Sequence, residues 1–94
     1  MKIITLNSKV GLCDDLRTMD IDDAIVVANG SGGDPYGLEL IARRIWQLLH
    51  RPATVAGLCE ALLKEYDIDR ETCEREVLEF LNDSTREDLI RTAD

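Results

Sequence analysis

The side chains best suited to nucleophilic chemistry in this sequence are a single histidine and three cysteines. His50 stands beside Arg51 and Pro52, where a helix is expected to end. Catalysis by a serine or cysteine nucleophile needs a base held next to it. With one imidazole in such a place, the sequence favours a surface or helix-capping histidine over a catalytic base. We therefore expect that the protein is not an enzyme.

The cysteines do not suggest a disulfide or a metal site. Cys13, Cys59 and Cys73 are odd in number, far apart, and free of any C-x-x-C spacing. A disulfide framework is therefore not expected. A structural zinc site would need all three thiolates and His50 to meet from separate segments. Buried thiols that pack as small hydrophobic groups are the better interpretation, and we expect no metal and no cofactor.

Two short motifs resemble phosphate-related sites but stand in the wrong context. Gly30-Ser31-Gly32-Gly33 lacks the Lys-Ser/Thr ending of a P-loop and leads toward a strand, which favours a hairpin turn. Asp83-Ser84-Thr85 resembles the phosphopantetheine attachment site of acyl carrier proteins. That serine should begin a central helix, whereas Ser84 is expected at the end of the last helix. Neither motif predicts a phosphate site.

Length and charge indicate the number of domains and exclude some classes of binding partner. The 94 residues predict a single domain spanning 1–94. A formal net charge of -8 disfavours binding to a phosphate backbone, because that affinity comes mainly from Lys and Arg. The apolar run at the N-terminus is too short for a signal peptide, and no stretch reaches the length of a membrane span. We expect a cytoplasmic protein that binds neither nucleic acid nor membrane.

Up to about Tyr36, the pattern predicts strands. Val10 and Leu12 alternate with polar residues, and residues 24–28 form a continuous apolar run bounded by turn-forming residues. Residues 29–35 supply the reversal that leads into a returning strand from Tyr36 to Glu39. A further strand from Ile3 to Leu6 is left open. The segment from Asp14 to Asp20 is expected to be a loop.

From Leu38 onward the apolar spacing is that of helices. The first helix must end before Pro52, and its apolar stripe is Leu38, Ile41, Ala42, Ile45, Leu48 and Leu49. Thr54 is the expected N-cap of a second helix, whose inward stripe is Val55, Leu58, Cys59, Leu62 and Tyr66. Asp69 is the expected N-cap of a third helix, whose inward stripe is Cys73, Val77, Phe80, Leu81 and Ser84. The sequence thus predicts an α+β winged helix-turn-helix with a three-stranded antiparallel sheet followed by three helices.

The charge of the third helix distinguishes two candidate functions. In a winged-helix DNA-binding transcriptional regulator this helix often enters the major groove, but here residues 69–76 carry more acids than bases. The same helix could instead line a groove beside the strand Tyr36 to Glu39. An edge strand offers unpaired backbone groups that an extended peptide can complete. Peptide binding is therefore the first interpretation, and DNA regulation is the alternative.

A family resemblance supports the first interpretation. The sequence resembles the PqqD-like family between about Ala24 and Ile90, through the motifs Tyr36-Gly37-Leu38-Glu39, Ala42, Ile45-Trp46, Leu48-Leu49, Thr54-Val55, Leu58, Leu62, Tyr66-Asp67-Ile68-Asp69, Val77, Phe80-Leu81 and Leu89-Ile90. Members of that family recognise the leader of ribosomally made, post-translationally modified precursor peptides. Of its members, the stand-alone leader-binding proteins of the lasso-peptide type are the most similar. These work with a separate leader protease and a cyclase.

The resemblance implies a set of binding residues. The leader should lie along Tyr36, Gly37 and Leu38, and against exposed parts of Cys73, Val77 and Leu81. Arg70 and Arg75 would then meet acidic residues of the leader. Ile45, Trp46 and Phe80 are better interpreted as core residues, whereas Tyr36, Val77 and Leu81 are the better site candidates. The sequence leaves open the identity of the precursor, its modification and the oligomeric state of the protein.

Three positions depart from the pattern of the family. Glu39 stands where members usually have Asn, Ser84 where they have Leu, and Asp88 where they have Gly. These departures concern the cap of the first helix and the end of the third. The overall pattern of strands and helices is not affected.

Overall fold

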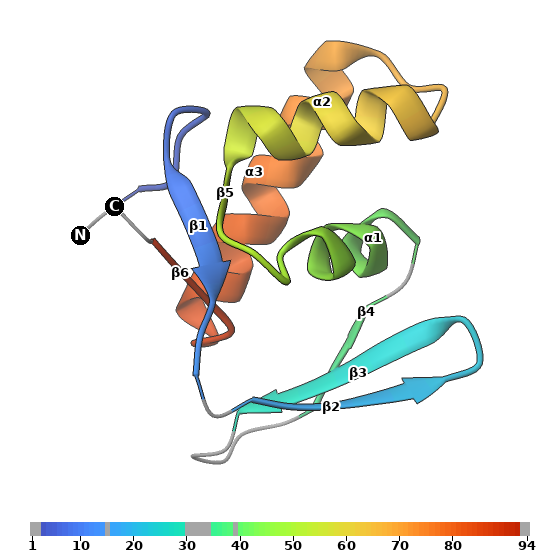
Figure 1. The fold of residues 1–94 in the computed structure, drawn as a ribbon, viewed down its shortest axis with the longest axis vertical. Helices are drawn as coiled ribbons and strands as arrows, with labels where there is room; N and C mark the ends of the chain where they lie inside the picture. Colours follow the sequence, from blue (N-terminus) through green and yellow to red (C-terminus); the bar gives the residue numbers. More distant parts are fainter. Residues whose placement is uncertain (1–2, 15, 30–34, 39, 93–94) are drawn as a thin grey trace.

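The computed structural model describes residues 3–14, 16–29, 35–38 and 40–92 of the chain. Figure 1 shows its helices and strands, coloured along the sequence. In chain order they are β1 (Lys9–Leu12), β2 (Leu16–Ile21), β3 (Ala24–Asn29), β4 (Tyr36–Leu38), α1 (Leu40–Leu48), β5 (Ala53–Thr54), α2 (Val55–Glu65), α3 (Arg70–Arg86) and β6 (Ile90–Thr92). The turn expected at Gly30 to Gly33, and the strand end and helix cap expected at Glu39, lie outside the described residues.

A three-stranded antiparallel sheet, here called the wing sheet, has the strand order β2-β3-β4. Its register places Val26 between Met19 of β2 and Gly37 of β4. The predicted α+β fold, with a three-stranded antiparallel sheet and three helices, is confirmed. The loop predicted from Asp14 to Asp20 is wrong, because β2 occupies most of that segment. Since β2 is an outer strand with mostly exposed side chains, it lacks the buried alternation that reveals a strand.

The strand predicted around Val10 and Leu12 exists, but it belongs to a second sheet. This sheet has the order β5-β1-β6, with Val10 registered against Ala53 and Thr92. The segment from Ile3 to Leu6 is not a strand. Its Ile4 is buried, and the Ile4 amide donates a 3.2 Å hydrogen bond to Asn82 Oδ1 of α3. The N-terminal segment is thereby attached to the last helix.

The predicted N-caps of the second and third helices are confirmed. The Thr54 hydroxyl accepts a hydrogen bond from the Gly57 amide, and the Asp69 carboxylate accepts one from the Thr72 amide. Each cap satisfies one of the amides that have no partner in the first turn of a helix. Pro52 predicted that the first helix must stop ahead of it, and α1 ends at Leu48. Local sequence therefore sets the limits of these helices.

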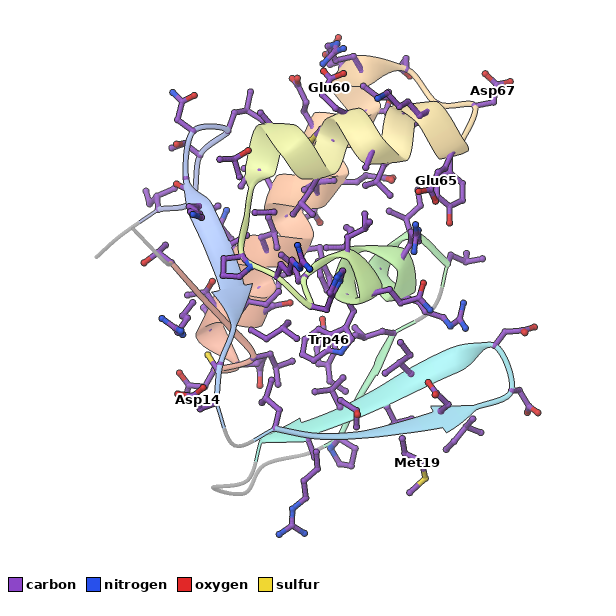
Figure 2. All side chains as sticks on the ribbon, viewed as in Figure 1. Asp14, Met19, Trp46, Glu60, Glu65 and Asp67 are labelled. Atoms are coloured by element: carbon purple, nitrogen blue, oxygen red, sulfur yellow. The ribbon has the colours of Figure 1, made fainter. Side chains whose placement is uncertain are left out.

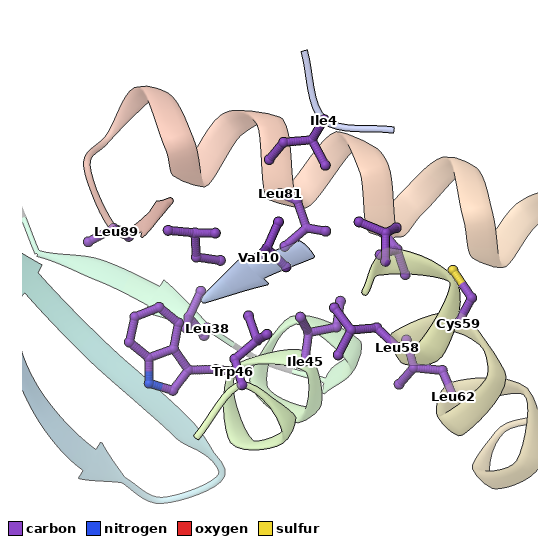
Figure 3. Packing of buried hydrophobic residues seen from close by; sticks show 14 of the residues in the cluster. Ile4, Val10, Leu38, Ile45, Trp46, Leu58, Cys59, Leu62, Leu81 and Leu89 are labelled. Atoms are coloured by element: carbon purple, nitrogen blue, oxygen red, sulfur yellow. The ribbon is translucent and has the colours of Figure 1, made fainter. Parts of the chain in front are cut away.

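The core lies where α1 packs against β3 and β4 on one side and against α2 and α3 on the other. Ile45 and Trp46 are buried there, as predicted, and Figure 2 shows Trp46 between α1 and the wing sheet. Phe80, also predicted as core, is only partly buried at the margin. Figure 3 shows Leu38, Leu81 and Val10 in the same apolar interior, although they come from three distant segments. None of the described helices has the length and apolar character needed to cross a bilayer.

Candidate functional site

The edge strand β4 is the first part of the candidate site. Tyr36 is half-buried, Gly37 is exposed, and Leu38 is buried with 1% of its surface exposed. β4 pairs with β3 along one edge, and within the described residues no strand pairs with its other edge. A β carbon placed on Gly37 would meet no heavy atom within 4 Å. The outer edge of β4 therefore has no β partner among the described residues, and the face of the sheet at Gly37 is uncovered.

The inward face of α3 is the second part. Cys73, Val77 and Leu81 are 1%, 0% and 0% exposed, so the exposed portions expected of these side chains are absent in this structure. Their side chains share one core cluster with Leu38 of β4. The spacing that suggested a groove wall is equally the spacing of a buried helix face. These three residues therefore hold α3 in place from the interior.

Arg70 does not come together with β4. It is exposed at the start of α3, and its Nη1 donates to Glu60 Oε1 of α2 at 2.8 Å, with Glu74 Oε2 at 3.8 Å. This hydrogen bond and the charge of Arg70 hold the pKa of Glu60 below its usual range. In Figure 1 the start of α3 lies beside α2, at the opposite end of the molecule from the wing sheet. Arg70 thus links two helices of the protein itself.

A shallow hollow on α3 was missed by reasoning from the sequence. It has a volume of about 290 Å³ and is lined by Glu76, Glu79, Phe80 and Asp83. The signal was present in the sequence, because positions 76, 80 and 83 follow one another on the same side of a helix. The sequence instead predicts Phe80 as a core residue, because it belongs to the apolar stripe of the third helix. The outward flank of α3 is acidic around this ring.

The side chains capable of nucleophilic chemistry are not arranged for it. Burial raises the pKa of the thiols of Cys13 and Cys73, and burial together with Cys73 raises the pKa of Cys59 to about 12. Protonated thiols are poor nucleophiles. His50 is exposed, and its Nδ1 donates a 3.0 Å hydrogen bond to the carbonyl of Gln47, so it caps the end of α1 as predicted.

Ser84 is not available for modification. It is completely buried, and its hydroxyl has no hydrogen-bond partner within the described structure. A phosphopantetheine attachment site must be exposed to its transferase. The sequence argument from the position of Ser84 in the last helix is therefore supported by its burial.

Comparisons with known proteins place this geometry in a family. A comparison with curated protein sequences finds no match. Among solved structures, the complex described as "TbiB1 in Complex with the TbiA(beta) Leader Peptide" is similar to this chain with 30% sequence identity and a TM-score of 0.80. The similarity covers 89% of this chain and 99% of the TbiB1 chain. The family described as coenzyme PQQ synthesis protein D (PqqD) matches residues 24–90. This range includes the wing strands β3 and β4 and all three described helices. The chain belongs to this family.

Proposed function

We propose that this protein is a non-catalytic binding protein for the leader segment of a ribosomally made precursor peptide. The observation that carries the proposal is the open edge of β4, in a chain that is 30% identical to a protein solved with a leader peptide. The leader adds to β4 as one further strand. Backbone hydrogen bonds supply much of the affinity, and alternate side chains supply specificity.

The proposed contact surface runs along Tyr36, Gly37 and Leu38 and reaches the flank of α3. Gly37 presents bare backbone, and the half-buried Tyr36 ring offers a surface for an apolar anchor of the leader. Val77 and Leu81, together with Cys73, support this surface from beneath, because their side chains are buried in the core. Arg70 is left out of the contact set, since it is paired with Glu60 at the far end of α3.

The bound leader is delivered to a maturation enzyme, such as a leader protease with a cyclase or another tailoring enzyme. The resemblance to stand-alone leader-binding proteins supports this step. The three cysteines are free thiols, which fits a reducing cytoplasm. In this role the domain supplies recognition, and the enzyme supplies the chemistry.

DNA regulation, the alternative, finds no support in the charges of α3. The helix carries five carboxylates and three arginines. Arg70 is paired with Glu60, and Arg86 is paired with Asp83. A recognition helix with this balance would be repelled by a phosphate backbone. No observation favours this function over peptide binding.

A titration of the fluorescently labelled leader tests the proposal. The leader is taken from the precursor gene that neighbours the gene for this protein. We expect an affinity near micromolar, about -8 kcal/mol, because ordering the peptide offsets much of the gross interaction energy. Raising the salt concentration should change it little, whereas DNA binding would fall steeply. Absence of leader binding at tens of micromolar would reject the proposal.

A further inference from the structure

A second cavity lies beyond the end of β4, where α1 begins. Its volume is about 670 Å³, and it is lined by residues 21–24 of the β2–β3 hairpin, by Leu40 and Arg43 of α1, and by Tyr66 after α2. We call these residues the hairpin surface. In Figure 1 the turn between β2 and β3, the start of α1 and the end of α2 lie along one side of the molecule. The leader-binding proposal uses none of these residues.

One nitrogen of Arg43, which lines this cavity, has no hydrogen-bond partner in the part of the chain that the structure describes. Arg43 Nε is buried and has no hydrogen-bond acceptor among the described residues. A buried donor of this kind costs stability until an acceptor reaches it. Asp22 and Asp23 line the same cavity. The hairpin surface therefore carries one cationic side chain and two carboxylates around a single cavity.

The hairpin surface is also apolar and strained. Ile21 is 48% exposed and Leu40 is 82% exposed, and Met19, two residues before Ile21 on β2, is 62% exposed. Leu40 adopts left-handed backbone with a φ of 55°, and Asp22 does so with a φ of 52° in the two-residue hairpin turn, where aspartate tolerates it. That conformation is rare for a leucine, and strained residues gather at sites of binding and catalysis. Exposed apolar side chains next to a cavity indicate a contact surface.

We infer that the hairpin surface is a contact between two copies of this chain. A two-fold contact requires that each group on one protomer meet its complement on the other, and vice versa. The hairpin surface is complementary to itself in charge, because the Arg43 guanidinium and the Asp22 and Asp23 carboxylates lie around one cavity. Leu40 of each protomer enters the cavity of its partner, and Arg43 of each faces the partner's hairpin carboxylates. The contact uses none of the residues of the proposed leader site and does not depend on leader binding.

Sedimentation velocity over protein concentrations from about 5 to about 500 µM measures this association. The unmodified protein should shift from monomer toward dimer within that range. Leu40→Asn removes the apolar side chain, and asparagine tolerates the left-handed backbone at this position. It should weaken the dimer at least about tenfold. Ile3→Ser, a change at an exposed hydrophobic residue outside the hairpin surface, is the matched control and should leave association unchanged.

A charge exchange tests the predicted pairing directly. Arg43→Glu and Asp23→Arg should each be monomeric alone, because each places like charges face to face. Their equimolar mixture should form a heterodimer, since opposite charges again meet. Asp23 is changed rather than Asp22 because Asp22 has a positive φ, where a long side chain adds strain.

Circular dichroism establishes that each variant is folded before it is compared. A monomeric unmodified protein at about 500 µM, or variants that associate as it does, would overturn the inference. So would a mixture that stays monomeric. If Leu40→Asn instead weakened leader binding in a monomeric protein, the hairpin surface would belong to the leader, and the inference would also fail.

Discussion

Gly37 of β4 is registered against Val26 of β3, and within the described residues no strand lies beyond Gly37. The wing sheet thus ends in a short strand whose outer backbone groups lack a β partner. A β carbon at Gly37 would meet no other atom within 4 Å, so the face of the sheet is uncovered at this position. The account of leader binding depends on this arrangement.

Tyr36 tests the side-chain contribution at this edge. Its ring is half-buried beside the core, so part of it remains available to a leader. Tyr36→Ala should weaken leader affinity about tenfold, because aromatic anchors carry a large share of binding energy. The control is Met19→Ala, since Met19 is exposed on β2, the opposite outer strand. Fluorescence anisotropy gives both affinities, and equal affinities would remove Tyr36 from the site.

Variants of Val77 test whether this side chain belongs to the core or lines an exposed groove. Its side chain is completely buried on α3. Val77→Asp should prevent folding, because a carboxylate in the core has no partner. Val77→Ala should lower the free energy of unfolding by about 2 kcal/mol, measured by urea denaturation, through lost burial and a small cavity. A folded Val77→Asp variant that no longer binds leader would show that Val77 faces the groove.

Asp88 occupies a position that favours glycine. The Leu89 amide donates to the Ser84 carbonyl at 2.9 Å and the Asp88 amide to the Thr85 carbonyl at 3.2 Å, with Asp88 at a φ of 58°. These bonds form a Schellman motif, whose left-handed residue is usually glycine. Asp88→Gly should therefore raise the free energy of unfolding by about 1 kcal/mol.

The control for Asp88→Gly is one residue earlier. Glu87 has a φ of -91°, so glycine gains nothing there. Glu87→Gly should leave stability unchanged or lower it by up to about 1 kcal/mol, because glycine loses more conformational freedom on folding. Urea denaturation of both variants gives the comparison. A less stable Asp88→Gly variant would show that the other contacts of Asp88 outweigh its backbone strain.

Arg44 and Glu65 couple stability to acid pH. Arg44 Nε donates to Glu65 Oε1 at 2.7 Å, and the second nitrogen contact is 2.9 Å, so the pair joins α1 to the end of α2. The hydrogen bond from Arg44 lowers the pKa of Glu65 from its ordinary value of 4.5. A carboxyl with a lowered pKa in the folded state contributes stability above its unfolded pKa. That contribution is lost as the pH falls through the folded pKa.

Glu65→Gln removes this titration. The urea midpoint is compared between pH 6 and pH 3, on either side of the ordinary carboxyl pKa of 4.5. Over this range it should fall more for the unmodified protein than for the variant. Because the pair is partly exposed, with 35% and 37% of the two side chains accessible, the difference should be small and should shrink in high salt. Parallel pH profiles would contradict the coupling.

The helices could be predicted from the sequence because their signals are local. Thr54 and Asp69 act on amides three residues away, and the apolar stripes of α2 and α3 repeat within each helix. The strand β2 could not be predicted, since its exposed residues show no buried alternation. The partners of β1 could not be predicted either, because strands of two or three residues carry no signal of pairing across the chain.

The candidate site was only partly predictable for a related reason. Tyr36, Gly37 and Leu38 were placed on an edge strand by their position after a turn. Cys73, Val77 and Leu81 are apolar at helical spacing, a pattern that both a core face and a groove wall produce. The hairpin surface left no signal, because a leucine gives no indication in the sequence of a left-handed backbone.

An N-methyl scan of the leader peptide tests strand addition most directly. Each leader amide in turn is methylated, and the affinity of each peptide is measured by fluorescence anisotropy. If the leader pairs with β4, only amides that point toward it should matter, so affinity should fall at every second position over the contacting segment. An affinity that falls at consecutive positions, or nowhere, would contradict the addition of the leader to β4.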